Sequence, residues 1–142
     1  ANEGRLTLDV GRRAGVSPGM GVVNRDGLLA TVQTVTETGS VALTLGSPSL
    51  RFGALDLSAT PPLVGLARGT GTDETEVTFF SPDAPVRVGD AVVTSGFSAP
   101  LPRGLVVGRV VRVSPRPEFG QVRATVAPAA DVGASRRVEV VR

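Results

Sequence analysis

The chain has 142 residues and a mass of 14.5 kDa, which allows one ordinary domain or two very small ones. It contains no Cys, His, Lys, Trp or Tyr, which excludes disulfides, Cys- or His-based metal sites, Ser-His-Asp triads and lysine Schiff bases. All fifteen basic residues are Arg against thirteen carboxylates, so the net charge is only +2 despite a pI of 10.9, and this argues against a nucleic-acid-binding domain.

Apolar and polar residues alternate along several short segments, which is the pattern of half-buried strands. In chain order the alternation is clearest at residues 6–10, 41–45, 121–126 and 138–140. Turn residues separate such segments roughly every 8–12 positions; they cluster at 17–19, 26–27, 38–40, 47–48, 61–62, 69–71, 81–83 and 114–117. No stretch keeps a helical period for three turns, so the pattern predicts an all-β sandwich or barrel.

Residues 19–35 and 89–113 resemble each other, because each reads as a tight turn, a strand, a loop and a long strand. Either any β-barrel would repeat this order, or the chain holds two related small barrels that meet near Pro61-Pro62. Proline cannot donate a hydrogen bond to a sheet, which suits a boundary. We predict a first barrel domain over residues 1–61 and a second over 62–142, packed firmly together. As an alternative, the last strand returns to the first barrel.

Two segments invite a catalytic interpretation, and neither supports one. Ser95 follows a predicted strand, but the sequence offers no base to activate its hydroxyl, so we interpret it as a turn residue. Asp73, Glu74 and Glu76 lie beside a predicted hairpin turn and lack the spacing of an EF-hand loop, which favours a solvated loop. We therefore predict no catalytic, cofactor-binding or metal-binding residue.

The segment 95–104 is a candidate interaction loop, since Phe97, Leu101 and Pro102 stand there among Gly and Pro residues. Its apolar side chains either form an exposed patch for a partner or tuck under the loop and plug one end of a barrel. We predict that Phe97, Leu101 and Pro102 face a partner, with Phe79 and Phe80 as a second patch.

Arg103, Arg109, Arg112 and Arg116 make the second half of the chain locally positive. They either solubilise an exposed strand face or meet phosphates or an acidic partner. No aromatic residue is interleaved with this group, whereas single-strand-binding barrels place aromatic residues along a basic groove. The pattern favours an exposed strand face.

An ordered set of short phrases runs through most of the chain: LDVG at residues 8–11, GVSPGM at 15–20, VVNRDGL at 22–28, VGD at 88–90, VVTSGF at 92–97, LPRGLVVGRV at 101–110, PAAD at 128–131 and VEVV at 138–141. Together they resemble the MreC family, the cell-shape proteins of rod-forming bacteria. The first half departs from the family pattern at Ala30-Thr31, where the family usually has Gly followed by Arg or Lys, and residues 50–65 are not distinctive.

The resemblance implies two small packed six-stranded β-barrels, related to those of trypsin-like proteases but without catalytic machinery. It implies a non-enzymatic periplasmic scaffold for peptidoglycan synthesis during cell elongation, without a cofactor. Its partners would be further copies of itself, in a homodimer or filament, and the ectodomain of the elongation transpeptidase. In the full-length protein, MreB, MreD and RodA would join them. The family's N-terminal membrane helix and coiled coil are not in this sequence, and that helix would anchor the protein to the inner membrane.

Two other classes of function predict different observations. A cell-wall-binding domain or a carboxylate-dependent hydrolase of the cell wall would show a concave cleft with two close acids. A barrel that binds single-stranded nucleic acid would show an affinity that falls steeply with salt. The small net charge argues against nucleic acid as a partner.

Overall fold

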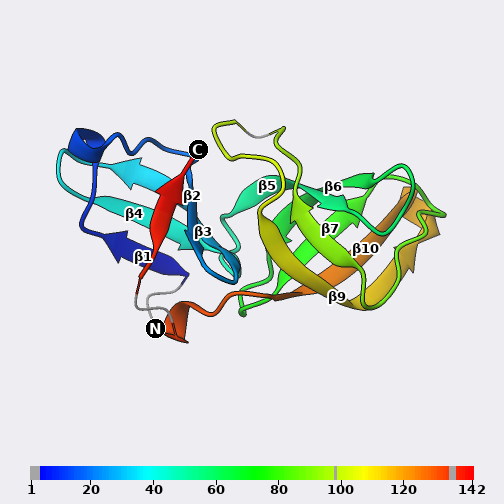
Figure 1. Ribbon diagram of the computed structural model, residues 1–142. Helices are drawn as coiled ribbons and strands as arrows, with labels where there is room; N and C mark the ends of the chain where they lie inside the picture. Colours follow the sequence, from blue (N-terminus) through cyan, green and yellow to red (C-terminus); the bar gives the residue numbers. More distant parts are fainter. Residues whose placement is uncertain (1–3, 98, 135–136) are drawn as a thin grey trace.

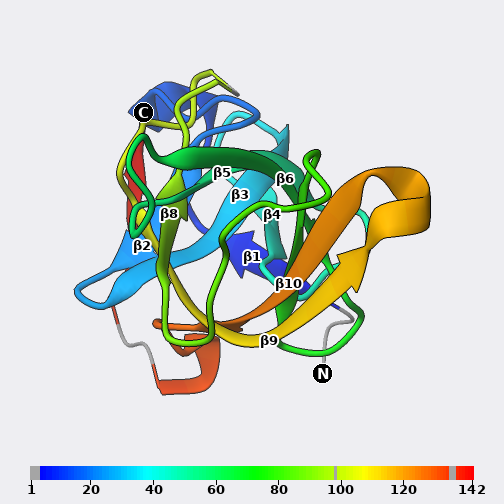
Figure 2. The same ribbon diagram turned by 90° about the vertical axis from the view of Figure 1, so that its right-hand side faces the viewer.

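The computed structural model describes residues 4–97, 99–134 and 137–142 (Figure 1). Over these residues the chain forms eleven strands and three short 3-10 segments, η1 (Arg12–Ala14), η2 (Pro117–Phe119) and η3 (Val132–Ala134). The predicted all-β class is therefore confirmed. The strands divide into two units, which lie side by side in Figure 1 and one in front of the other in Figure 2.

The first unit is an antiparallel sheet of five strands in the order β1-β4-β3-β2-β11, where the resemblance implies a second six-stranded barrel. Its strands are β1 (Arg5–Leu8), β2 (Gly21–Asn24), β3 (Gly27–Val35), β4 (Ser40–Thr44) and β11 (Glu139–Val141). The side chain of Asn24 shapes the turn between β2 and β3, because its Oδ1 accepts hydrogen bonds from the backbone N–H groups of Asp26 and Gly27 at 2.8 and 3.2 Å. The last strand of the chain pairs with β2, so it returns to this unit.

The second unit is a closed six-stranded barrel in the order β10-β7-β6-β5-β8-β9, as the family resemblance implies. Its strands are β5 (Arg51–Asp56), β6 (Leu63–Gly69), β7 (Thr75–Phe79), β8 (Ala91–Thr94), β9 (Val106–Arg116) and β10 (Gln121–Pro128). Strand β5 pairs with β6 and β8. The predicted border at residues 61 and 62 consequently falls within the barrel, in the turn between β5 and β6.

The two units share part of their core. Leu28 of β3 and Leu101 of the loop between β8 and β9 belong to the same buried cluster as Phe52 and Val107 of the barrel. The backbones also approach closely, because a Cβ atom on Gly27 would lie 2.6 Å from the carbonyl oxygen of Val106. Figure 1 shows residues 95–97 and 99–104 reaching from the barrel toward β2 and the C-terminus. The loop therefore holds the barrel against the sheet.

Candidate interaction surface

The outer face of β6 is apolar, although it faces away from the barrel core. Along β6 the burial alternates, so that Gly65 and Ala67 point inward while Val64 and Leu66 point outward and are 49 % and 46 % exposed. Gly65 pairs with Phe79, which places Val64 beside Phe80, the residue that directly follows β7. Phe80 is 65 % exposed.

Phe97 lies next to this face because the loop after β8 lies flat on β5. The backbone N–H of Ser95 donates a 2.9 Å hydrogen bond to the carbonyl oxygen of Gly53, and Ser95 Oγ accepts one from the N–H of Phe97 at 3.2 Å. A Cβ atom on Gly53 would lie 2.2 Å from Ser95 Oγ, so a side chain there would force Ser95 Oγ to rotate away from the N–H of Phe97. Because Gly53 pairs with Leu66, Phe97 extends the outer face of β6.

We call Val64, Leu66, Phe80 and Phe97 the outer apolar surface. Phe97 is 73 % exposed, the largest value among the exposed apolar residues of the described chain. Exposed apolar groups that gather on one face of a domain are typical of interaction sites, whereas scattered ones carry no such meaning. The predicted residues Phe80 and Phe97 thus lie on one surface rather than on two.

The structure corrects the expectation for two of the predicted residues. Phe79 and Leu101 are 1 % and 3 % exposed, and both lie in the barrel core cluster. Neighbouring residues of a strand point to opposite faces, so Phe79 and Phe80 could not both face outward. Pro102 is half-buried, and its carbonyl oxygen accepts a hydrogen bond from Thr94 Oγ1.

Sequence reasoning missed Val64 and Leu66. The available signal was that β6 reads Leu63-Val64-Gly65-Leu66-Ala67, with an apolar residue at every position. A strand of a small barrel needs only its inward positions to be apolar, so large apolar residues at both outward positions indicate a surface with a second purpose.

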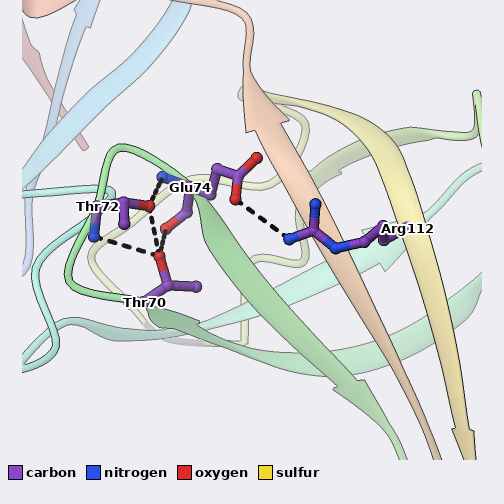
Figure 3. Close-up of polar contacts among 4 residues, drawn as sticks. All are labelled: Thr70, Thr72, Glu74 and Arg112. Atoms are coloured by element: carbon purple, nitrogen blue, oxygen red, sulfur yellow. Dashed lines mark hydrogen bonds and ion pairs between the residues drawn. The ribbon is translucent and has the colours of Figure 1, made fainter.

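The acidic residues between β6 and β7 form a solvated hairpin loop, as predicted. Thr70 Oγ1 accepts a hydrogen bond from the backbone N–H of Thr72, and the two threonine hydroxyls are 2.8 Å apart (Figure 3). Glu74 forms an exposed ion pair of 3.4 Å with Arg112 of β9, and Glu76 forms one of 3.5 Å with Arg68. These two glutamates therefore pair with arginines. The described residues include no group of three or more metal-ligating side chains.

A pair of carboxyl groups lies at the end of β5. Asp56 is fully buried, and its Oδ1 accepts a 2.8 Å hydrogen bond from the N–H of Ser58, whereas its Oδ2 has no hydrogen-bond partner among the described residues. Burial, followed by the effect of the neighbouring Asp90 carboxyl, raises the pKa of Asp56 to about 6. Burial acts in the same direction on Asp90, but the neighbouring Asp56 carboxyl and the hydrogen bond from the N–H of Arg87 outweigh it and lower the pKa of Asp90.

This acid pair does not lie in the cleft that the structure shows. A cleft of about 1160 Å³ is lined by the start of β1 and by the segments 44–48, 71–73 and 127–133. Neither Asp56 nor Asp90 is among its lining residues. The geometry that the hydrolase interpretation predicts, with the two close acids inside the cleft, is therefore not formed by this pair.

None of the described helical segments has the length and apolarity that a membrane-crossing helix requires.

Comparison with known proteins gives a consistent result. The sequence model of the family described as "Rod shape-determining protein MreC, barrel core" matches residues 1–142. The structure of MreC from Listeria monocytogenes superposes with a TM-score of 0.88 at 25 % identity, covering 99 % of this chain and 68 % of that one. The crystal structure of MreC from Pseudomonas aeruginosa gives 0.80 at 28 % identity, with 99 % and 90 % covered. No curated protein matches the sequence.

A third structure contains a bound partner. The complex between Penicillin-Binding Protein (PBP2) and MreC from Helicobacter pylori matches with a TM-score of 0.71 at 20 % identity, covering 84 % of this chain and 74 % of that one. At this level of identity the match supports the shared fold.

Proposed function

The chain belongs to the MreC family of rod shape-determining proteins, whose barrel-core model spans its full length, and from this premise we propose that it is a non-catalytic scaffold that binds a peptidoglycan transpeptidase through its outer apolar surface. The observation that carries the proposal is the gathering of Val64, Leu66, Phe80 and Phe97 on one face of the barrel. The complex of PBP2 with MreC from Helicobacter pylori supports a transpeptidase as the partner.

The energetics of this surface suit a binding anchor. Burying one large apolar side chain contributes about 1.5–3 kcal/mol, and a few such side chains at the centre of an interface supply most of its affinity. Val64 and Leu66 stand on a paired strand and Phe80 directly follows one. Phe97 donates its N–H to Ser95 Oγ, and the N–H of Ser95 donates to the carbonyl oxygen of Gly53 on β5. Little conformational entropy is therefore lost when a partner covers them.

The proposal extends to the setting of the protein. The domain acts outside the cytoplasmic membrane during elongation of the lateral wall, anchored to the inner membrane and connected to MreB, MreD and RodA in the full-length protein. Copies associate through the sheet unit, since β1 and β11 stand at the two edges of the sheet and edge strands are natural pairing sites. The barrel is closed and offers side chains instead.

Calorimetric titration into the ectodomain of the elongation transpeptidase from the same organism tests the transpeptidase proposal. We expect saturable binding that is selective over a division transpeptidase. Leu66→Ser and Phe80→Ser should each raise the Kd at least tenfold, which corresponds to about 1.4 kcal/mol. The matched control is Val138→Ser, because Val138 is 40 % exposed and directly precedes β11 of the sheet unit, outside the outer apolar surface. Wild-type affinity in folded Leu66 and Phe80 variants would refute the assignment of the surface.

A further inference from the structure

The outer apolar surface continues into a basic strip on the neighbouring strands β10 and β9. The pairing register gives one row directly, since Leu66 pairs with Thr78, Thr78 with Arg123, and Arg123 with Ser114. Residues in one row share a face of the sheet, so Arg123 is on the same outer face as Leu66, two strands away. At about 4.8 Å per strand, their backbones are roughly 10 Å apart.

A second row ends on another arginine. Val122 pairs with Phe79, which places Gln121 beside Phe80, and Gln121 pairs with Arg116 of β9. Arg116 is exposed and Arg123 is half-buried. Both arginines therefore flank the aromatic end of the outer apolar surface from the same side.

Carboxylates pair with the arginines further along this face, whereas Arg116 and Arg123 have no carboxylate partner among the described residues. In the third row, Arg68 forms an ion pair with Glu76, and Arg112 at the other end of the row is paired with Glu74. Within the described part of the chain, neither Arg116 nor Arg123 takes part in an ion pair. The positive charge of the face is thus concentrated next to Phe80.

Two polar atoms in the same place have no hydrogen-bond partner. Arg123 Nε and Gln121 Oε1 are both buried, and no described residue supplies an acceptor for the first or a donor for the second. A buried polar atom without a partner destabilises the folded state. Because no hydrogen bond holds Arg123 Nε in place, the guanidinium group can turn outward toward an acceptor that a bound partner brings.

From this arrangement we propose that the transpeptidase element covering the outer apolar surface carries an Asp or Glu side chain about 10 Å from its apolar anchor, and that this carboxylate binds Arg123 and Arg116. The proposal rests on the proposed function, because it assumes a transpeptidase on that surface. Guanidinium groups pair with carboxylates through short, charge-assisted hydrogen bonds, so an acidic group fits this strip. An apolar anchor beside it favours a protein partner over a nucleic acid.

The experiment is the same titration repeated at about 50, 150 and 500 mM NaCl, since charge pairing at an interface weakens with ionic strength. The variants are Arg116→Gln, Arg123→Gln and the double substitution. Arg13→Gln is the matched control, because Arg13 is exposed on η1 in the sheet unit. We expect the wild-type Kd to rise with salt. The double variant should bind about tenfold more weakly at the lowest salt and lose most of the salt dependence, while Arg13→Gln behaves as wild type.

Because Arg123 is half-buried, a substitution there could also disturb the fold. A charge reversal at the exposed position, Arg116→Glu, provides a second test, and a melting curve checks that this variant is folded. It should weaken binding more than Arg116→Gln does. Unchanged affinity and salt dependence in all arginine variants, with binding still lost in Phe80→Ser, would overturn this inference and leave the proposed function standing. If Leu66→Ser and Phe80→Ser also bind normally, the proposed function itself fails.

Discussion

The buried carboxyl pair at the end of β5 makes the stability of the barrel dependent on pH in an unusual direction. Asp56 is fully buried, and burial together with the neighbouring Asp90 carboxyl favours the form of Asp56 that carries a proton. The substitution Asp56→Asn replaces that titrating proton with a permanent amide N–H donor next to Asp90. The Asn carbonyl oxygen can still accept the hydrogen bond that Ser58 donates to Asp56.

The sign follows from the direction of the pKa shift. The pKa of Asp56 is raised from 3.8 to about 6 in the folded protein, so the folded state binds more protons than the unfolded state between these values. The free energy of unfolding should therefore decrease as pH rises through this window and level off above it. The pKa of Asp90 is lowered from 3.8 in the folded protein, so the stability that its charged form contributes is lost as the pH falls below that value.

The magnitude is set by the same shift. A rise of about two units in the pKa of Asp56 corresponds to about 3 kcal/mol. This value is the upper limit of the free energy of unfolding that the wild type loses between mildly acidic and neutral pH. We expect Asp56→Asn to be about 1–3 kcal/mol more stable than the wild type at pH 7.5 and about equal to it near pH 4.5. Its free energy of unfolding should vary little between these two values.

Urea unfolding at pH 4.5, 5.5, 6.5 and 7.5 measures this directly. Far-UV circular dichroism is the appropriate probe, because the chain has no Trp or Tyr for fluorescence. Asp83→Asn, at an exposed position in the turn after β7, serves as the control and should keep the wild-type pH profile. A wild-type profile that is flat or rises from pH 4.5 to 7.5, or an Asp56→Asn variant that keeps the wild-type slope, would refute the reasoning.

Three further substitutions test the packing. Leu101→Ala removes a buried side chain shared by the two units and should lower the free energy of unfolding by about 2–4 kcal/mol in urea; a loss below about 1 kcal/mol would contradict its place in the core. Gly53→Ala would bring a Cβ atom within 2.2 Å of Ser95 Oγ, so Ser95 Oγ must rotate and lose the hydrogen bond from the N–H of Phe97. It should weaken transpeptidase binding while changing the Tm by only a few degrees, and wild-type binding would contradict the role of this hydrogen bond in holding Phe97. Glu74→Gln breaks an exposed ion pair and should change stability by less than about 0.5 kcal/mol, which a larger loss in thermal melts would disprove.

Local sequence patterns predicted the strands well, because the alternation of apolar and polar residues along a strand can be seen within a few neighbouring residues. The turns at 26–27 and 69–71 separate the strands that they were expected to separate, and Ser95 directly follows β8, as interpreted. The closure of the barrel depends on pairing between β7 and β10 and between β5 and β8. Such long-range pairing leaves no local signal, so the six-stranded barrel came from the family resemblance.

The candidate surface was only partly predictable for the same reason. Phe97 and Leu101 stand in one loop with similar surroundings in the sequence, yet Phe97 is exposed and Leu101 joins the core. The side that each takes depends on strands from distant parts of the chain, because Phe97 lies beside Gly53 of β5 and Leu101 belongs to the core cluster that contains Leu28 of β3. The alternation rule alone could have separated Phe79 from Phe80.

The order of strands makes the barrel an insertion between two strands of the other unit. The sheet unit contains the first strand and the last one, β1 and β11, at its opposite edges, while all six barrel strands lie between β4 and β11 in the sequence. A mechanical load applied to both ends of the described chain therefore acts across the five-stranded sheet and reaches the barrel only after an edge strand has peeled away. A partner bound to the barrel would stay bound to a folded domain while the sheet carries the tension.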